Sequence, residues 1–316
     1  MNPGIYPGLS MAEYIALPAL SAGVVRTTVD RCPAAARFES WLNPRRPADD
    51  TDASDVGTIA HAILLEGSED CCQVFDPADY PNAKGGGVAT GWTNKAIQEA
   101  RGAARSAGKI PILIDDIREI RDLVAAAIAF IDSLRDTEPA VWQAFQPDGG
   151  QSEVTFVWQE GETLCKARAD RISLTNEVII DYKTSAMSVE PDRWGRTQLV
   201  NMGYYVSAAW YCRGVRALTG VNPTYLFLCG ETAAPHLHSI VGCDPETLAL
   251  GDEKVGVGLR LWQKCFTTNT WPAYANRVVY PALPVYERMR WDERNGIGAD
   301  GIPYDISKLF ERKESA

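Results

Sequence analysis

The sequence reads CKARADRI over residues 165–172 and EVIIDYKT over residues 177–184. Both stretches have the pattern of β-strands, and each places an acidic residue, Asp170 or Asp181, where the apolar pattern ends. Because side chains alternate between the two faces of a strand, Asp181 and Lys183 leave one face while Tyr182 points to the other. The second stretch therefore predicts an acid and an amine side by side at a strand end.

The two acids are predicted to meet. Asp170 and Asp181 are 11 residues apart, which suits neighbouring antiparallel strands joined by a tight turn at residues 173–176. Two carboxylates held together repel, and a hard divalent cation is the usual reason to tolerate them. The alternative is that Asp170 is a turn residue and that Asp181 and Lys183 form an exposed ion pair of little value. The β-branched run before Asp181 favours the metal site, because buried strands rarely end in paired charges.

The composition is that of an ordinary globular protein. Its 316 residues are 46% hydrophobic, enough for one large domain or two small ones. The sequence shows neither a signal-peptide pattern nor an apolar run of about 18 residues, so we expect a cytoplasmic protein without a membrane span. The eight cysteines include no C-x-x-C pair, which argues against an iron–sulfur site. A net charge of −10 opposes a broadly basic surface, but a local basic groove or a metal ion can still hold phosphate.

The chain divides into three predicted parts, which are an extended, Pro- and Gly-rich arm over residues 1–20, a main domain over 21–270 and a Pro-rich, irregular tail over 271–316. Helices are expected near residues 21–41, 55–67, 94–107, 115–134, 194–217 and 245–266. Strands are expected near residues 153–158, 163–173, 178–183, 224–229 and 236–241.

His61 lies on the otherwise apolar helix expected over residues 55–67. Taken alone, such a histidine is more often a packed core residue than a metal ligand. The balance changes if a partner site exists. A glycine-rich loop over residues 80–92 contains Lys84 but lacks the G-K-[ST] ending of a phosphate-binding loop, so nucleotide binding is not expected.

The order helix, three strands, helix, strand, with D-x-K on the third strand and a histidine upstream, resembles the PD-(D/E)XK nuclease superfamily. Within it, the chain is similar to the phage-type exonuclease VIII (RecE-like) branch over about residues 5–245. The similar segments are GTIAHAILLE (57–66), RAD (168–170), DYKT (181–184) and YVSAAWY (205–211). The resemblance implies an α/β fold with an αβββαβ core, a central mixed sheet flanked by helices, and helical N-terminal additions.

The resemblance also implies roles for single residues. His61, Asp170 and Asp181 would bind Mg²⁺ or Mn²⁺, with the backbone carbonyl of Tyr182 as a further ligand. Lys183 would orient the attacking water and help to deprotonate it. Glu153 would lie near the metal ion, as a ligand through water.

Contacts with DNA are expected from a second group of residues. Arg168 shares a strand face with Asp170 and is either a phosphate ligand or a solvated strand residue. Relatives carry a glutamine four residues before a tyrosine on the helix after D-x-K. Here Tyr211 fits, but Ser207 stands at the glutamine position, and Gln198 would lie on the opposite face of a continuous helix.

The implied activity is a metal-dependent exonuclease that degrades linear double-stranded DNA, 5′→3′, in phage-type recombination beside a single-strand annealing protein. Another nuclease of this fold, of the repair or CRISPR-associated type, is an alternative against which the missing cysteine cluster counts. A catalytically inactive DNA-binding scaffold is the third alternative, opposed by the intact charged set. An acidic enzyme that degrades DNA processively must hold the duplex without a broadly basic surface, and a ring that encloses the DNA would do so. We therefore expect a ring of three or four subunits, built through the arm and the tail, with Lys84, Lys95 and Arg101 near its channel.

Overall fold

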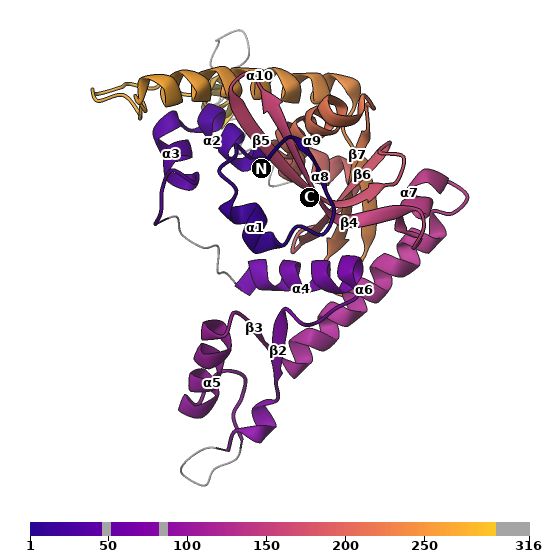
Figure 1. Ribbon diagram of the computed structural model, residues 1–316. Coiled ribbons are helices and arrows are strands. Elements are labelled where there is room, and N and C mark those ends of the chain that lie inside the picture. The colour runs from indigo at the N-terminus through magenta and orange to yellow at the C-terminus, as the bar shows by residue number, and fades with distance from the viewer. Residues whose placement is uncertain (46–51, 82–87, 295–316) are drawn as a thin grey trace, which may run out of the picture. The chain divides into compact units, whose positions relative to one another are not determined.

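The strands expected around both acidic motifs form the middle of a six-stranded sheet in the computed structural model of the chain (Figure 1). The structure describes residues 1–45, 52–81 and 88–294. The strands lie in the order β1(Gly4–Tyr6), β4(Gly150–Glu160), β5(Thr163–Ser173), β6(Val178–Ser185), β7(Thr224–Glu231) and β8(His238–Gly242). Only the β6–β7 pair is parallel. The expected mixed sheet is confirmed.

Strands β5 and β6 are joined as the spacing predicts. Asn176 donates its N–H to the carbonyl of Ser173 at 2.9 Å, and it has a φ of 62°, a left-handed conformation that asparagine tolerates in turns. The last paired residues are Arg171 with Ile180 and Ile172 with Ile179. One further step in this register places Asp170 across from Asp181, where the two strands part.

Helices cover both faces of the sheet (Figure 1). On one face, α2(Ala22–Asp30), α9(Tyr204–Thr219) and α10(Pro245–Thr268) enclose an apolar core with four fully buried tryptophans, Trp158, Trp194, Trp210 and Trp262. On the other face, α4(Asp52–Glu66), α6(Ile114–Ser133) and α7(Pro139–Phe145) pack on Val178, Ile180 and Tyr182 of β6. The buried face of α6 is the one that the sequence predicts.

The first twenty residues differ from the expected extended arm. They form β1, which pairs with β4 at the edge of the large sheet, and α1(Met11–Ala16). Leu20 then pairs with Cys165 of β5 through an isolated bridge. The segment is rich in proline and glycine, yet it packs on its own domain because the open edge of β4 and the carbonyl-binding side chains of β5 offer it partners.

Two further differences concern the helices. The single helix expected over residues 194–217 is divided into α8(Pro191–Trp194), a π-helical turn over Gly195–Leu199 and α9, and Gly203 adopts a φ of 64° just before α9. The predicted irregular tail contains α11(Val285–Arg294). This helix belongs to a second unit, Tyr274–Ala316, while Met1–Ala273 form the first.

A small lobe lies between α4 and α6 in the chain, and the sequence predicts its helix but not its pair of strands. The lobe consists of the parallel strands β2(Cys72–Phe75) and β3(Ile110–Leu113) and the helix α5(Lys95–Ser106). The helix α3(Pro33–Glu39) lies elsewhere in the first unit, between α2 and α4 in the chain. Its core holds Phe75, Ala89, Ile97 and Ala104. Among the described residues, no helix is long and apolar enough to cross a membrane.

Two glycines of α10 give a test of the packing between α9 and α10. A Cβ atom on Gly251 would lie 2.5 Å from the carbonyl oxygen of Tyr205, whereas one on Gly256 would meet only the mobile end of Arg260 at 3.4 Å. Both substitutions by alanine gain about 0.5–1 kcal/mol of helix propensity. We expect Gly251→Ala to lower the free energy of unfolding by about 1–3 kcal/mol and Gly256→Ala to leave it equal or higher. Urea unfolding of both variants measures the difference, and equal stabilities would contradict the close contact.

Candidate active site

A cleft of about 1360 Å³ opens where β4, β5 and β6 meet α4 and the N-terminal segment. It exceeds the range of about 300–1,000 Å³ that is usual for small-molecule sites. Its walls combine acidic, basic and aromatic side chains. The lining includes Ser10, Met11, Tyr14, Gly57, Thr58, His61, Glu66, Cys71, Glu153, Arg168, Asp170, Lys183, Met202, Tyr204 and Tyr211.

Three acids lie in a row on three neighbouring strands, and two of them, Glu153 and Asp170, line the cleft. Ser152 pairs with Arg171 and Val154 with Ala169, so Glu153 lies across from Asp170, which in turn lies across from Asp181. Directly paired residues of antiparallel strands bring their Cβ atoms within about 4.5–5.5 Å. The predicted meeting of Asp170 and Asp181 is therefore present, and Glu153 extends it.

His61 of α4 faces this row of acids. Its Nε2 lies 2.8 Å from an Asp170 carboxylate oxygen and its Nδ1 lies 3.3 Å from a Glu153 carboxylate oxygen. Burial opposes a charged imidazole, but the negative charges of Asp170, Glu153 and Asp181 outweigh it and raise the pKa of His61 to about 9. The imidazole is therefore positively charged at neutral pH in this state, donates a hydrogen bond to Asp170 and forms an ion pair with Glu153.

Asp170 and Asp181 respond to this environment in opposite directions. Burial opposes ionisation of Asp170, but His61 and Lys183 hold its pKa below the ordinary value. The carboxylate also accepts the backbone N–H of Tyr182 at 2.9 Å. Burial, together with the neighbouring Asp170, raises the pKa of Asp181 to about 7, although Lys183 opposes the shift. Of the two acids, Asp181 therefore holds a proton more readily than Asp170.

Lys183 is the cation on the β6 side of the row. Its Nζ lies 2.7 Å from an Asp181 oxygen and 5.5 Å from the centre of the Tyr204 ring. Burial lowers the pKa of a lysine, but Asp181 and Asp170 more than compensate and raise it above the ordinary value. Lys183 is consequently charged throughout the physiological pH range and points into the cleft.

Arg168 does not offer a free guanidinium for a phosphate, in contrast to one of the two expectations. It forms an ion pair with Glu153, donates to the carbonyl of Leu9 and donates to the Thr155 hydroxyl at 3.1 Å. Its side chain is only 10% exposed. Strand alternation predicts its face correctly, but the partners come from the N-terminal segment and from Glu153, whose φ of 57° turns it out of a regular strand conformation.

The remaining sequence-predicted residues are scattered. Tyr211 lines the cleft, whereas Gln198 is buried and donates to the Ser185 hydroxyl at 2.9 Å. Ser207 lies on α9 and is not among the residues that line the cleft. Lys95 forms an exposed ion pair with Glu99 on the lobe, and Lys84 lies outside the described residues.

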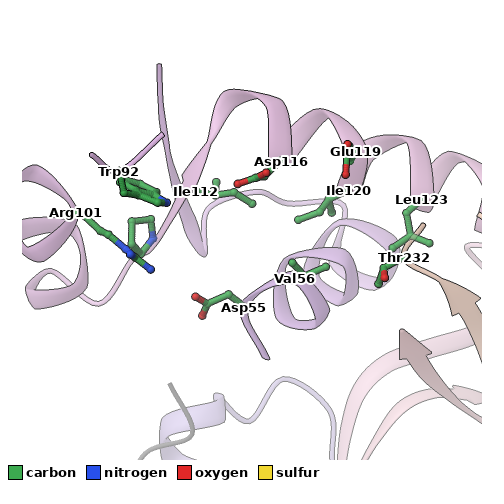
Figure 2. Close-up of a pocket in the computed structure, with 11 residues that line it drawn as sticks. Asp55, Val56, Trp92, Arg101, Ile112, Asp116, Glu119, Ile120, Leu123 and Thr232 are labelled. Atoms are coloured by element: carbon green, nitrogen blue, oxygen red, sulfur yellow. The ribbon is translucent and has the colours of Figure 1, made fainter. Parts of the chain in front are cut away.

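Arg101 lines a second cavity of about 300 Å³, away from the acidic row (Figure 2). Its guanidinium lies over the ring of Trp92, 4.8 Å from the centre. Figure 2 shows Asp116, Ile120 and Leu123 of α6 along the opposite side. Of the described basic residues expected near a DNA channel, neither Arg101 nor Lys95 lines the large cleft.

Sequence reasoning missed several residues that line the large cleft. Met11 and Tyr14 come from the segment expected to be an extended arm, Met202 comes from the interruption before α9, and Tyr204 is the first residue of α9. Gly203 gave the only sequence signal for that interruption, since a glycine favours a positive φ. The position of residues 11–14 depends on contacts with β5, more than 150 residues away in the sequence.

The donor set fits a divalent cation. His61, Glu153 and Asp170 each offer one ligand atom, and these three atoms lie within 4.8 Å of one another. Carboxylate oxygens suit Mg²⁺ and Mn²⁺, and an imidazole nitrogen adds tolerance of Mn²⁺. Asp181 was expected as a metal ligand, but it lies beside this set and forms an ion pair with Lys183. Glu153 was expected to bind the metal ion through water, but it belongs to the set of direct donors and lies next to His61.

Comparisons with known proteins support the fold. The model of the family "PDDEXK-like domain of unknown function (DUF3799)" matches residues 27–283. The crystal structure named "Putative exonuclease", from Eubacterium rectale, is similar with a TM-score of 0.52 and 13% identity, over 89% of this chain and 97% of that one. The structure of SSO0001 matches with a TM-score of only 0.25 and 11% identity, over 57% of this chain and 81% of that one. No curated protein matches significantly.

The protonated His61 leads to a prediction for metal binding. Because an imidazole must lose its proton before it can bind a metal ion, the apparent affinity for Mn²⁺ should rise between about pH 6 and pH 8, by up to about tenfold per pH unit. The pKa of about 9 places this whole range below the titration of His61. Isothermal titration calorimetry in buffers of different ionisation enthalpy measures both the affinity and the proton release.

Two variants separate His61 from other titrating groups. His61→Gln keeps an oxygen donor but removes the titration, so its affinity should depend less on pH. His236→Gln alters a histidine between β7 and β8 whose Nδ1 lies 3.2 Å from the carbonyl oxygen of Glu231, outside the acidic row, and it should keep the wild-type slope. A flat pH dependence in the wild type would show that His61 is not a ligand.

Proposed function

The chain belongs to the family of PDDEXK-like domains DUF3799, and on that basis we propose that it is a metal-dependent nuclease that hydrolyses phosphodiester bonds of DNA. The observation that carries the proposal is the convergence of His61, Glu153 and Asp170, with Lys183 beside them, in a cleft of about 1360 Å³. Structural ion pairs alone rarely gather so many charged groups with perturbed pKa values in one cleft.

His61, Glu153 and Asp170 would hold Mg²⁺ or Mn²⁺. The ion would polarise the phosphoryl group and lower the pKa of a bound water molecule. Lys183 keeps its proton at neutral pH, so it would not itself accept the proton of the attacking water. Its fixed charge would instead orient that water, favour its deprotonation and stabilise negative charge on the attacked phosphate.

Asp181 supports Lys183 in this scheme. The 2.7 Å contact between the two side chains fixes the direction of the amine, because Asp181 itself is buried and held in β6. A carboxyl group with a pKa of about 7 can also take up or release a proton near neutral pH. Asp181 would thereby serve as the proton acceptor beside the lysine.

The finer assignment is an exonuclease that acts on the ends of linear double-stranded DNA. The name of the Eubacterium rectale protein supports an exonuclease. The 5′→3′ direction, the role in phage-type recombination and a single-strand annealing partner rest on the sequence resemblance to the RecE-like branch. A ring of three or four subunits is proposed on the same ground.

Digestion of linear duplex labelled at either the 5′ or the 3′ end, beside a closed circle of the same sequence, tests this assignment. We expect release of 5′-terminal mononucleotides from the linear DNA with Mg²⁺ or Mn²⁺, an intact circle, and no product with EDTA. Cleavage of the circle would identify an endonuclease instead. Hydrolysis that persists in EDTA would contradict the metal dependence.

Two substitutions test the roles of the charged residues. Asp170→Asn should lower hydrolysis by about 10²–10³-fold or more and weaken Mn²⁺ binding, because it removes a charged ligand. Lys183→Met should lower kcat by about 10²–10⁴-fold while metal binding is retained. Asp252→Asn is the matched control and should keep full activity. Asp252 lies on α10 and forms an ion pair with Arg213 of α9. Near-normal rates for folded Asp170→Asn would refute the site.

A further inference from the structure

Residues 8–17 border the large cleft, to which Gly8, Leu9, Ser10, Met11 and Tyr14 contribute. We propose that this segment, here called the N-terminal wall, binds the substrate strand, and that Lys166 is a positioning residue that holds the wall in place. The inference rests on the proposed nuclease function. It concerns residues that precede the part matched by the family model, which begins at residue 27.

Lys166 anchors the wall from β5. Its side chain is buried, with 5% of the residue exposed, and its Nζ lies 2.7 Å from the carbonyl oxygen of Tyr14, 2.8 Å from that of Leu17 and 3.4 Å from that of Ile15. An ammonium group has three N–H donors, which matches three acceptors. These carbonyls end α1, where the helix dipole is negative and a cation is favourable.

The other end of the wall is fixed as well. Arg168, two residues from Lys166 on the same strand face, donates to the carbonyl of Leu9. Ser10 and Glu13 form a capping box at the start of α1. Beyond the wall, Leu20 bonds the backbone of β5 in both directions, with N···O distances of 2.8 and 2.7 Å. The wall is thus a fixed structure between two anchors.

Lys166 itself is well placed to act as an anchor. Its backbone carbonyl accepts the indole N–H of Trp210 at 2.9 Å, and Trp210 is fully buried in the core under the sheet. Its ammonium lies 4.8 Å from the centre of the Tyr14 ring, which adds a cation–π contact to the hydrogen bonds. The position of the wall is therefore set by the core of the domain.

The chemistry of the wall suits nucleobases. Met11 is 50% exposed and lines the cleft together with Tyr14, and Met202, Tyr204 and Tyr211 line it from the region of α9. Bases stack on aromatic rings with little regard to sequence, and methionine adapts to flat rings. Lys183 and the metal ion that the acidic row would hold would take the phosphate, so the wall would contact the bases of the adjacent nucleotides.

Lys166→Met provides the main test, because Arg168 also bonds Glu153 and its replacement would disturb the acidic row. Fluorescence anisotropy with a labelled single-stranded oligonucleotide in EDTA measures binding without hydrolysis. We expect Kd to rise about tenfold, KM in Mn²⁺ to rise similarly and kcat to change less than about threefold. Limited proteolysis should cut within residues 8–17, and Mn²⁺ affinity should be unchanged.

Lys254→Met is the matched control. Lys254 also makes a tyrosine ring contact, 5.1 Å from the centre of Tyr205, and ties two elements together through Asp30, but it does not line the cleft. It should keep the wild-type Kd and KM. A lower melting temperature of Lys166→Met without the rise in Kd would show that Lys166 is purely structural and would overturn the inference.

Met11→Ser serves if Lys166→Met does not fold, since an exposed side chain contributes little to stability. It should raise Kd by about threefold at an unchanged melting temperature. Wild-type Kd in the folded variants would overturn the inference, as would failure of the wild type to bind the oligonucleotide at all. If the wild type binds the oligonucleotide but cleaves no DNA with either metal ion, the proposed hydrolysis fails, and the Kd ratios still decide the role of the wall.

Discussion

Repulsion between three carboxylates on adjacent strands is the constraint on which the rest of the site depends. The register places Glu153, Asp170 and Asp181 in one row, and buried like charges at such spacing cannot all stay ionised without cations. Each acid has a cation in contact: Arg168 for Glu153, His61 for Asp170 and Lys183 for Asp181. Two of these cations come from the same sheet, but His61 has to be supplied by a helix, so α4 must dock beside the row of acids.

Two side-chain hydrogen bonds and one close approach to a glycine fix how α4 packs on the sheet. The hydroxyl of Ser152, next to Glu153, donates to the carbonyl of Leu65 at 2.8 Å, and Arg171 donates to the same hydroxyl at 2.9 Å. At the other end, Gly57 lets the helix approach β6, because a Cβ atom there would lie 3.3 Å from the Thr184 hydroxyl. These contacts set where His61 lies, and none of them follows from the periodicity of α4 itself.

The sequence predicts what depends on local pattern. Alternation and an 11-residue spacing place Asp170 opposite Asp181, and the 3.6-residue period identifies the buried face of α6. The errors concern contacts between distant segments. Arg168 was on the expected face, but its partners Leu9 and Glu153 are distant in sequence. Composition suggested an extended arm over residues 1–20, and only Lys166, Arg168 and the edge of β4 give that segment a structure.

The choice of histidine at position 61 follows from the same electrostatic constraint. A lysine there would neutralise Asp170 but could not give up its proton readily enough to bind a metal ion. A glutamine could donate and accept hydrogen bonds but would leave the acids without a charge partner. An imidazole does both, because the acids that raise its pKa to about 9 are the same groups that would attract a dication in its place. In the proposed metal-bound state the residue therefore changes from counter-ion to ligand, and the carboxylate row is compensated in either state.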